Sequence, residues 1–112
     1  MDYLGDVLEK IKKKPAVYLG RPSIVCLQAF LSGYNVAQYQ LGVPLTAENP
    51  LDGFQEWIQQ KFGIESSQSW ANIILFFSQD ERDALDRFFE LFEEFQQRGR
   101  SSASNREYTQ VK

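Results

Sequence analysis

The sequence predicts an all-α fold, a single compact domain of about five helices with a disordered C-terminal tail. Apolar residues recur at the spacing of amphipathic helices, and prolines and glycines separate the segments that carry this pattern. A chain of 112 residues, 43% of them hydrophobic, is long enough for one core and too short for two. We therefore assign residues 1–99 to a helical domain and residues 100–112, which are polar and aperiodic, to a flexible tail.

The first helix is expected over residues 2–13. Acidic residues come first and lysines last, an order that the helix dipole favours, and Pro15 ends the helix because it pushes the preceding residue out of the α region. Residues 16–19 are apolar and precede Gly20, which allows a backbone turn. We expect these four residues to form a plug that packs against the core.

The second and third helices have recognisable ends. Ser23 is placed to cap the second helix, which Gly42 ends, and Gly33 inside it costs about 1 kcal/mol relative to alanine. We therefore expect Gly33 to mark a close helix crossing. Asn49 and Pro50 suit the cap and first position of a third helix that ends at Gly63.

Two further helices complete the domain. The run from Trp70 to Phe77 is apolar almost all round, and because no other segment offers a strand to pair with it, we expect a short buried helix. Ser78 and Glu81 have the spacing of a capping box that opens the last helix. That helix is expected to end at Gly99.

The residue types argue against catalysis. The chain has no histidine, so it lacks the commonest general base and the usual imidazole metal ligand. Its single cysteine, Cys26, stands between Val25 and Leu27, which indicates a packing role, and one cysteine cannot form a structural zinc site. We expect no enzymatic activity, no metal and no cofactor.

The same cysteine count bears on location, because one cysteine permits no internal disulfide. The acidic, amphipathic N-terminus does not resemble a secretion signal, and no apolar stretch approaches the roughly 18 residues of a membrane span. We expect a cytoplasmic protein that does not enter membranes.

Charge supplies the leading functional hypothesis. The net charge of −3 argues against nucleic-acid binding, which needs a positive field. Residues 80–94 contain seven acids and two arginines, a local net charge of −5. One interpretation is a solvated face opposite the lysines of the first helix. The other is an acidic surface for a basic protein partner, with these binding residues: Asp83, Asp86, Glu90, Glu93 and Glu94.

Two alternatives stay open. Lys12, Lys13, Lys14 and Arg21 lie around the turn at Gly20 and could bind a phosphate or nucleotide, since basic side chains and helix N-termini suit anions. The phenylalanine-rich last helix could instead form a homodimer with a structural role, if its side chains exceed what one small core can hold.

A resemblance covers roughly residues 4–96. It is carried, in order, by the stretches KKKPAVYLG, LQAFLSGY, FQEWIQQKFG, SWANIIL and ALDRFFELFEEF. This pattern is similar to small uncharacterised bacterial helical proteins, some of which look like immunity proteins of polymorphic toxin systems. That family pattern has Arg-Pro-x-Met-Tyr where this chain has residues 14–18, KPAVY. The resemblance implies an immunity-type inhibitor. Together with the charge of residues 80–94 and the lack of catalytic groups, it leads to the hypothesis that the acidic last helix covers the basic site of a cognate toxin.

Overall fold

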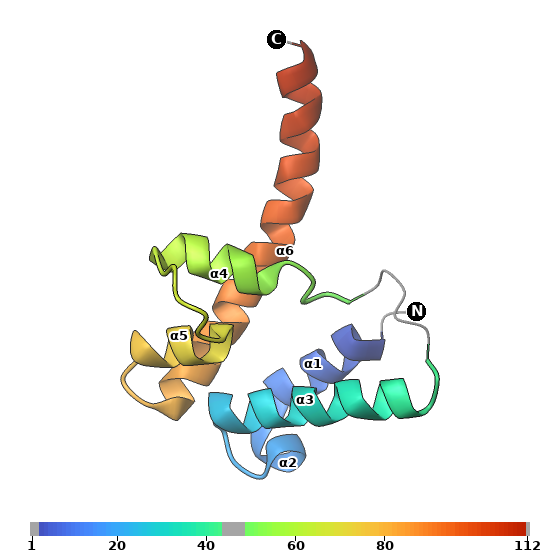
Figure 1. Cartoon of the computed structure of the whole chain (residues 1–112), viewed down its shortest axis with the longest axis vertical. Coiled ribbons are helices and arrows are strands. Elements are labelled where there is room, and N and C mark those ends of the chain that lie inside the picture. Colours follow the sequence, from blue (N-terminus) through green and yellow to red (C-terminus); the bar gives the residue numbers. More distant parts are fainter. Residues whose placement is uncertain (1–2, 44–48, 112) are drawn as a thin grey trace.

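The protein is all-α, as the sequence predicts. The computed structural model describes residues 3–43 and 49–111, and within these ranges it has helices and no strand (Figure 1). The helices are α1 Tyr3–Lys13, α2 Pro15–Leu19, α3 Ile24–Gln40, α4 Phe54–Phe62, α5 Trp70–Phe76 and α6 Glu81–Val111. Throughout the described part of the chain, no helix combines the length and the apolar character needed to cross a membrane.

The segment between α1 and α3 differs from our expectation. Pro15 does separate two elements, but it starts the additional short helix α2, which ends at Gly20 with φ 86°. The expectation that residues 16–19 form an apolar plug against the core is wrong. Val17 is 71% exposed and Tyr18 is also exposed, and only Leu19 of these three packs against the core. Successive residues of a helix point about 100° apart, so four consecutive apolar side chains cannot all face one core.

Helix α3 begins as expected. Ser23 is fully buried, and its hydroxyl accepts hydrogen bonds from the backbone N–H groups of Val25 and Cys26 at 3.1 and 3.3 Å. The expected close crossing at Gly33 is wrong, because a Cβ built there would meet no atom within 4 Å. The glycine in the middle of α3 therefore has no packing reason within the described chain.

Helix α4 starts later than the sequence indicates. The side chain of Asn49 accepts from Leu51 N at 3.0 Å, as a cap would, but it caps a turn and α4 begins only at Phe54. Gly53, with φ 82°, reverses the chain between this turn and the helix. Gly63 ends α4 in the left-handed region, with φ 66°, and confirms the predicted C-terminus.

Helix α5 confirms the expected short helix, with Ser69 as its cap, but not its complete burial. Ile73 and Ile74 lie in the core, whereas Phe76 is 79% exposed and Phe77 is also exposed.

The start of α6 corrects the predicted capping box. Ser78 donates its hydroxyl hydrogen to Ile74 O at 2.7 Å and so belongs to the end of α5. Asp80 is the cap, because its Oδ1 accepts from Asp83 N at 2.8 Å, and Asp83 Oδ2 accepts from Gln79 N at 2.9 Å. The side chain of Glu81 therefore takes no part in capping α6 and contacts Ser23 and Arg21 instead.

The end of α6 is also corrected, because the helix continues past Gly99 to Val111, and Figure 1 shows it extending beyond the other helices. The flexibility of residues 100–112 stays a prediction.

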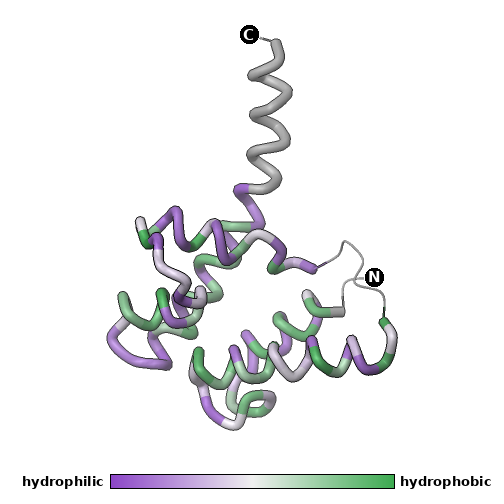
Figure 2. The backbone as a smooth tube through the Cα atoms, in the orientation of Figure 1, coloured by the Kyte–Doolittle hydropathy of each residue, from purple (hydrophilic) through white to green (hydrophobic). Residues whose placement is uncertain are grey.

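The core lies where α6 meets α3, α4 and α5. Phe88 of α6 and Phe54 of α4 are fully buried, with ring centroids 5.6 Å apart at 81°, and Trp70 stacks on Phe88 at 5.0 Å. Hydrophobic residues, green in Figure 2, recur along the helices that surround this centre. Phe89 and Phe92 are buried too, so one small core does hold most of the phenylalanine-rich face of α6. The condition that we set for a homodimer on that face is not met.

Candidate functional site

The five predicted partner-binding acids lie on one helix, away from its buried side. The buried residues of α6 are Ala84, Leu85, Phe88, Phe89 and Phe92. Of the five acids between and beyond them, Asp83 is half-buried and the other four are exposed. We call Asp83, Asp86, Glu90, Glu93 and Glu94 the acidic face of α6.

Three members of the acidic face have partners within the chain. Asp83 accepts from Gln79 N and forms an ion pair with Arg87, whose Nε lies 3.4 Å from Asp83 Oδ2. Lys61 Nζ of α4 lies 2.5 Å from Glu94 Oε2. Gln97 donates to Glu93 at 3.4 Å. Cations therefore compensate the charges of Asp83 and Glu94, whereas Glu93 has only the neutral amide of Gln97.

Asp86 and Glu90 are different. Both are exposed, and neither forms a hydrogen bond or ion pair with any described residue. They stand four residues apart on the helix, where like charges repel by a few tenths of a kcal/mol. These two carboxylates therefore have no polar partner in the described chain, and together with Glu93, which has only a neutral donor, they carry the uncompensated charge of the acidic face.

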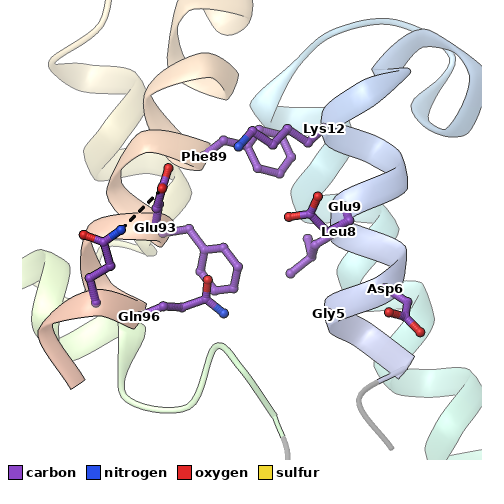
Figure 3. Close-up of a pocket in the computed structure, with 10 residues that line it drawn as sticks. Gly5, Asp6, Leu8, Glu9, Lys12, Phe89, Glu93 and Gln96 are labelled. Atoms are coloured by element: carbon purple, nitrogen blue, oxygen red, sulfur yellow. Dashed lines mark hydrogen bonds between the residues drawn. The ribbon is translucent and has the colours of Figure 1, made fainter. Parts of the chain in front are cut away.

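A groove of about 390 Å³ separates α1 from α6 and adjoins the acidic face (Figure 3). Leu8, Phe89 and Phe92 contribute apolar side chains to it, while Glu9 of α1 and Glu93 of α6 stand on opposite sides. The groove thus combines an apolar surface with carboxylates from two helices, which suits a side chain with an apolar stem and a positive head.

The lysines at the end of α1 do not neutralise the acidic face. Lys12, Lys13 and Lys14 are exposed, and the described structure has no ion pair between them and α6. Lys12 lines the groove across from Glu93 but lies beyond ion-pairing distance from it. The interpretation in which the acidic helix is balanced by these lysines therefore lacks direct contacts.

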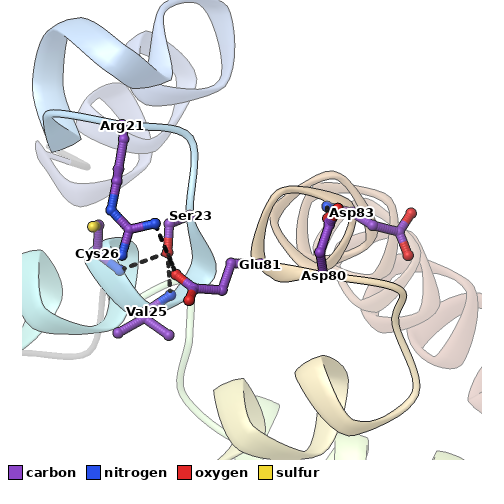
Figure 4. Close-up of polar contacts among 7 residues, drawn as sticks. All are labelled: Arg21, Ser23, Val25, Cys26, Asp80, Glu81 and Asp83. Atoms are coloured by element: carbon purple, nitrogen blue, oxygen red, sulfur yellow. Dashed lines mark hydrogen bonds and ion pairs between the residues drawn. The ribbon is translucent and has the colours of Figure 1, made fainter.

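A polar junction that we did not predict joins α3 to α6. Ser23 donates to Glu81 Oε1, the same oxygen that lies 3.1 Å from Arg21 NH1 (Figure 4). The hydrogen bond from Ser23 is the largest influence and lowers the pKa of Glu81 below its usual 4.5; partial burial opposes this, and the charge of Arg21 lowers the pKa further. One serine thus caps α3 and holds the first residue of α6.

This junction bears on the alternative anion site. Arg21 already pairs with Glu81, so an anion bound by Arg21 would have to compete with that carboxylate. Of the four basic residues proposed for the site, the three lysines have no such partner among the residues that the structure describes. Anion binding stays a prediction, and one of its four proposed donors is engaged by Glu81.

The structure also places the remaining reactive candidate. Cys26 is half-buried in the first turn of α3, where its backbone N–H bonds to Ser23. In the described ranges, no group of three or more cysteine, aspartate or glutamate side chains is arranged to hold a metal ion.

Sequence reasoning missed the exposed apolar side chains of α3. Val36 is 60% exposed, Val25 and Tyr39 are exposed as well, and so is Leu41, which directly follows the helix. A signal was present, because residues 22–47 contain no charged residue. An uncharged stretch of this kind is equally consistent with a helix that is buried on all sides and with a helix that exposes an apolar side, and only the structure distinguishes these two cases.

Comparisons with protein-family models, with curated proteins and with solved structures find no match to this chain.

Proposed function

We propose that the chain is a non-catalytic protein-binding domain that docks a basic protein on the acidic face of α6. The observation that supports this function is the pair Asp86 and Glu90, which repel each other on an exposed surface and have no polar partner in the described chain, while Asp83 and Glu94 are ion-paired. Complementary charge on a partner would relieve the repulsion and would speed and select association.

The more specific form of the proposal is an immunity-type inhibitor. It rests on the resemblance in sequence to bacterial proteins of that type, and it makes the partner a toxin whose basic site is covered by the acidic face. A basic protein fits this surface better than a nucleic acid does, because phosphates would be repelled by the same carboxylates.

The groove between α1 and α6 would supply an anchor for such a partner. An arginine or lysine inserted there would lay its methylene groups against Phe89 and Phe92 and place its charge near Glu9 and Glu93. Arginine is the stronger candidate because its planar head stacks on aromatic rings and forms paired hydrogen bonds with carboxylates.

Capture of partners from the cell of origin tests the proposal. The variant Asp86→Lys/Glu90→Lys reverses the two unpaired charges and leaves the ion pair of Glu94 intact. The matched control is Asp52→Lys/Glu65→Lys, which makes the same change of net charge at two exposed acids that are not part of α6.

We expect a basic partner that the intact chain and the control retain and that the α6 variant loses. Identical partners for all three proteins would exclude the acidic face as the docking surface. Equal loss in both variants would show that net charge alone governs binding.

A further inference from the structure

The chain forms a basic corner where it turns from α1 into α3. Residues 10–47 contain four lysines, one arginine and no acid, the reverse of the charge balance on α6. Helix α2 lies in this corner, at the end of the molecule opposite to the C-terminal end of α6 (Figure 1). We give the name basic corner to these residues: Lys13, Lys14, Val17, Tyr18 and Arg21.

The cations of the basic corner are largely uncompensated. Lys13 and Lys14 are exposed, and their ammonium groups form no hydrogen bond or ion pair with any described residue. Arg21 pairs with Glu81, yet 60% of its side chain stays exposed. Lys10 is exposed too and lies one helical turn before Lys14, whose N–H donates to Lys10 O at 3.0 Å. The corner therefore carries a positive field, although the whole chain has a net charge of −3.

Apolar side chains project from the same corner. None of the five residues of α2 is fully buried, and Val17 and Tyr18 are 71% and 41% exposed. Val17 N donates to Lys14 O at 3.1 Å, which places the exposed valine within one turn of that lysine. The two apolar side chains therefore stand between cations, with Lys14 before them in the chain and Arg21 after them.

We infer that the basic corner binds the surface of an anionic lipid membrane. The headgroups would attract the cations, Val17 would enter the boundary between headgroups and acyl chains, and Tyr18 would lie at the headgroup level, where tyrosine is enriched. Attachment of this kind holds a protein at the surface of a bilayer and needs no helix that spans it.

Charge and apolar exposure together select this partner. The uncompensated cations require an anionic surface. Among such surfaces the exposed valine favours a bilayer, because a nucleic-acid backbone offers an aliphatic side chain no apolar surroundings. An acidic protein would need a fitted pocket for Val17, whereas a bilayer accepts an apolar side chain of any shape.

The strength of the attachment follows from two modest contributions. Each lysine near an anionic membrane raises the affinity by a factor of about five, and burial of one valine raises it about tenfold. Neither contribution anchors a protein alone, since stable attachment takes two signals. Binding should therefore be reversible and should weaken when salt screens the lysines.

Co-sedimentation with lipid vesicles tests the charge. Vesicles of phosphatidylcholine and phosphatidylserine in equal parts are the anionic probe, and vesicles of phosphatidylcholine alone are the neutral one. Lys13→Gln/Lys14→Gln removes two cations from the corner. Its control, Arg82→Gln/Arg98→Gln, makes the same change of net charge at two exposed arginines of α6.

A second pair of variants tests the apolar contact. Val17→Asn removes the valine from the corner, and Val36→Asn makes the same change at another exposed valine, on α3. Valine and asparagine have similar helix propensities, so neither helix should be lost. Circular dichroism checks that every variant keeps its helices.

The intact chain should bind the anionic vesicles, ignore the neutral ones and dissociate at high salt. The double lysine variant should bind about 30-fold more weakly and Val17→Asn about tenfold more weakly, whereas both controls should bind like the intact chain. No binding to anionic vesicles, equal binding to neutral ones, or equal weakening in a control would overturn the inference. Unchanged binding by Val17→Asn would also overturn it, because the corner would then attract any polyanion by charge alone. Asp86→Lys/Glu90→Lys should still bind the vesicles, so this result is independent of the proposed function.

Discussion

Replacing Ser23 by alanine should destabilise the protein more than the loss of an ordinary helix cap. Removal of a capping serine costs about 0.5–2 kcal/mol. Ser23 has 0% of its surface exposed and serves the N–H groups of both Val25 and Cys26, so water cannot easily replace it. We therefore expect Ser23→Ala to lower the free energy of unfolding by about 2 kcal/mol, measured by urea denaturation.

A second serine cap provides the control. Ser69 caps α5 through one hydrogen bond from Asn72 N at 3.2 Å and is not fully buried, so Ser69→Ala should cost about 1 kcal/mol. A double-mutant cycle of Ser23→Ala with Glu81→Gln should be non-additive, because both changes act on the same hydrogen bond. Equal losses at the two caps, or an additive cycle, would refute the assigned role of Ser23.

Three further results are expected. Because the folded pKa of Glu81 is lowered, its contribution to stability is present above pH 4.5 and is lost as the pH falls through the folded pKa; acid titration of Glu81→Gln should lack this loss. Gly33→Ala should raise the free energy of unfolding by about 1 kcal/mol in dilute solution, and no gain would contradict the open space around Gly33. Glu90→Lys should stabilise the chain by about 0.5 kcal/mol at low salt, because it replaces repulsion from Asp86 and Glu94 with attraction; an effect unchanged at high salt would exclude this cause.

The sequence predicts the ends of helices well where the boundary residue strongly favours one local conformation or one local hydrogen bond. Pro15 separates two elements, Ser23 caps α3 and Gly63 ends α4 in the left-handed conformation, all as expected. These residues act through their own backbone or through neighbours within three positions. Local chemistry is therefore enough to place them.

Boundaries that depend on a distant contact were not predictable. Ser78 and Asp80 both offer a cap for α6, and Ser78 has the better spacing to Glu81. In the structure Asp80 is the cap, and Glu81 is engaged instead by Ser23, which is 58 positions away in the chain. No pattern within the last helix contains that information.

The candidate site was predictable in part for the same reason. Charge along the chain identified the acidic residues, but whether an acid is neutralised depends on what the fold brings near it. Lys61, 33 positions from Glu94, is such a partner, while the lysines of α1 have the right charge and do not reach α6. The structure thus separates the ion-paired Asp83 and Glu94 from the three acids without a cation, of which Asp86 and Glu90 also lack any hydrogen bond within the described chain.

The fold tolerates repulsion on α6 because the helix is held by its other side. Burying a phenylalanine such as Phe88 contributes about 1.5–3 kcal/mol, and Phe89 and Phe92 add comparable amounts. Like charges four residues apart cost about 0.2–0.5 kcal/mol. The free energy gained by burying these phenylalanines exceeds the cost of the like-charge repulsion several-fold. The requirement to fold therefore does not determine which residues stand at positions 86 and 90. A neutral pair there would fold at least as well, so stability gives no reason for two carboxylates, whereas the proposed binding of a basic partner would give one.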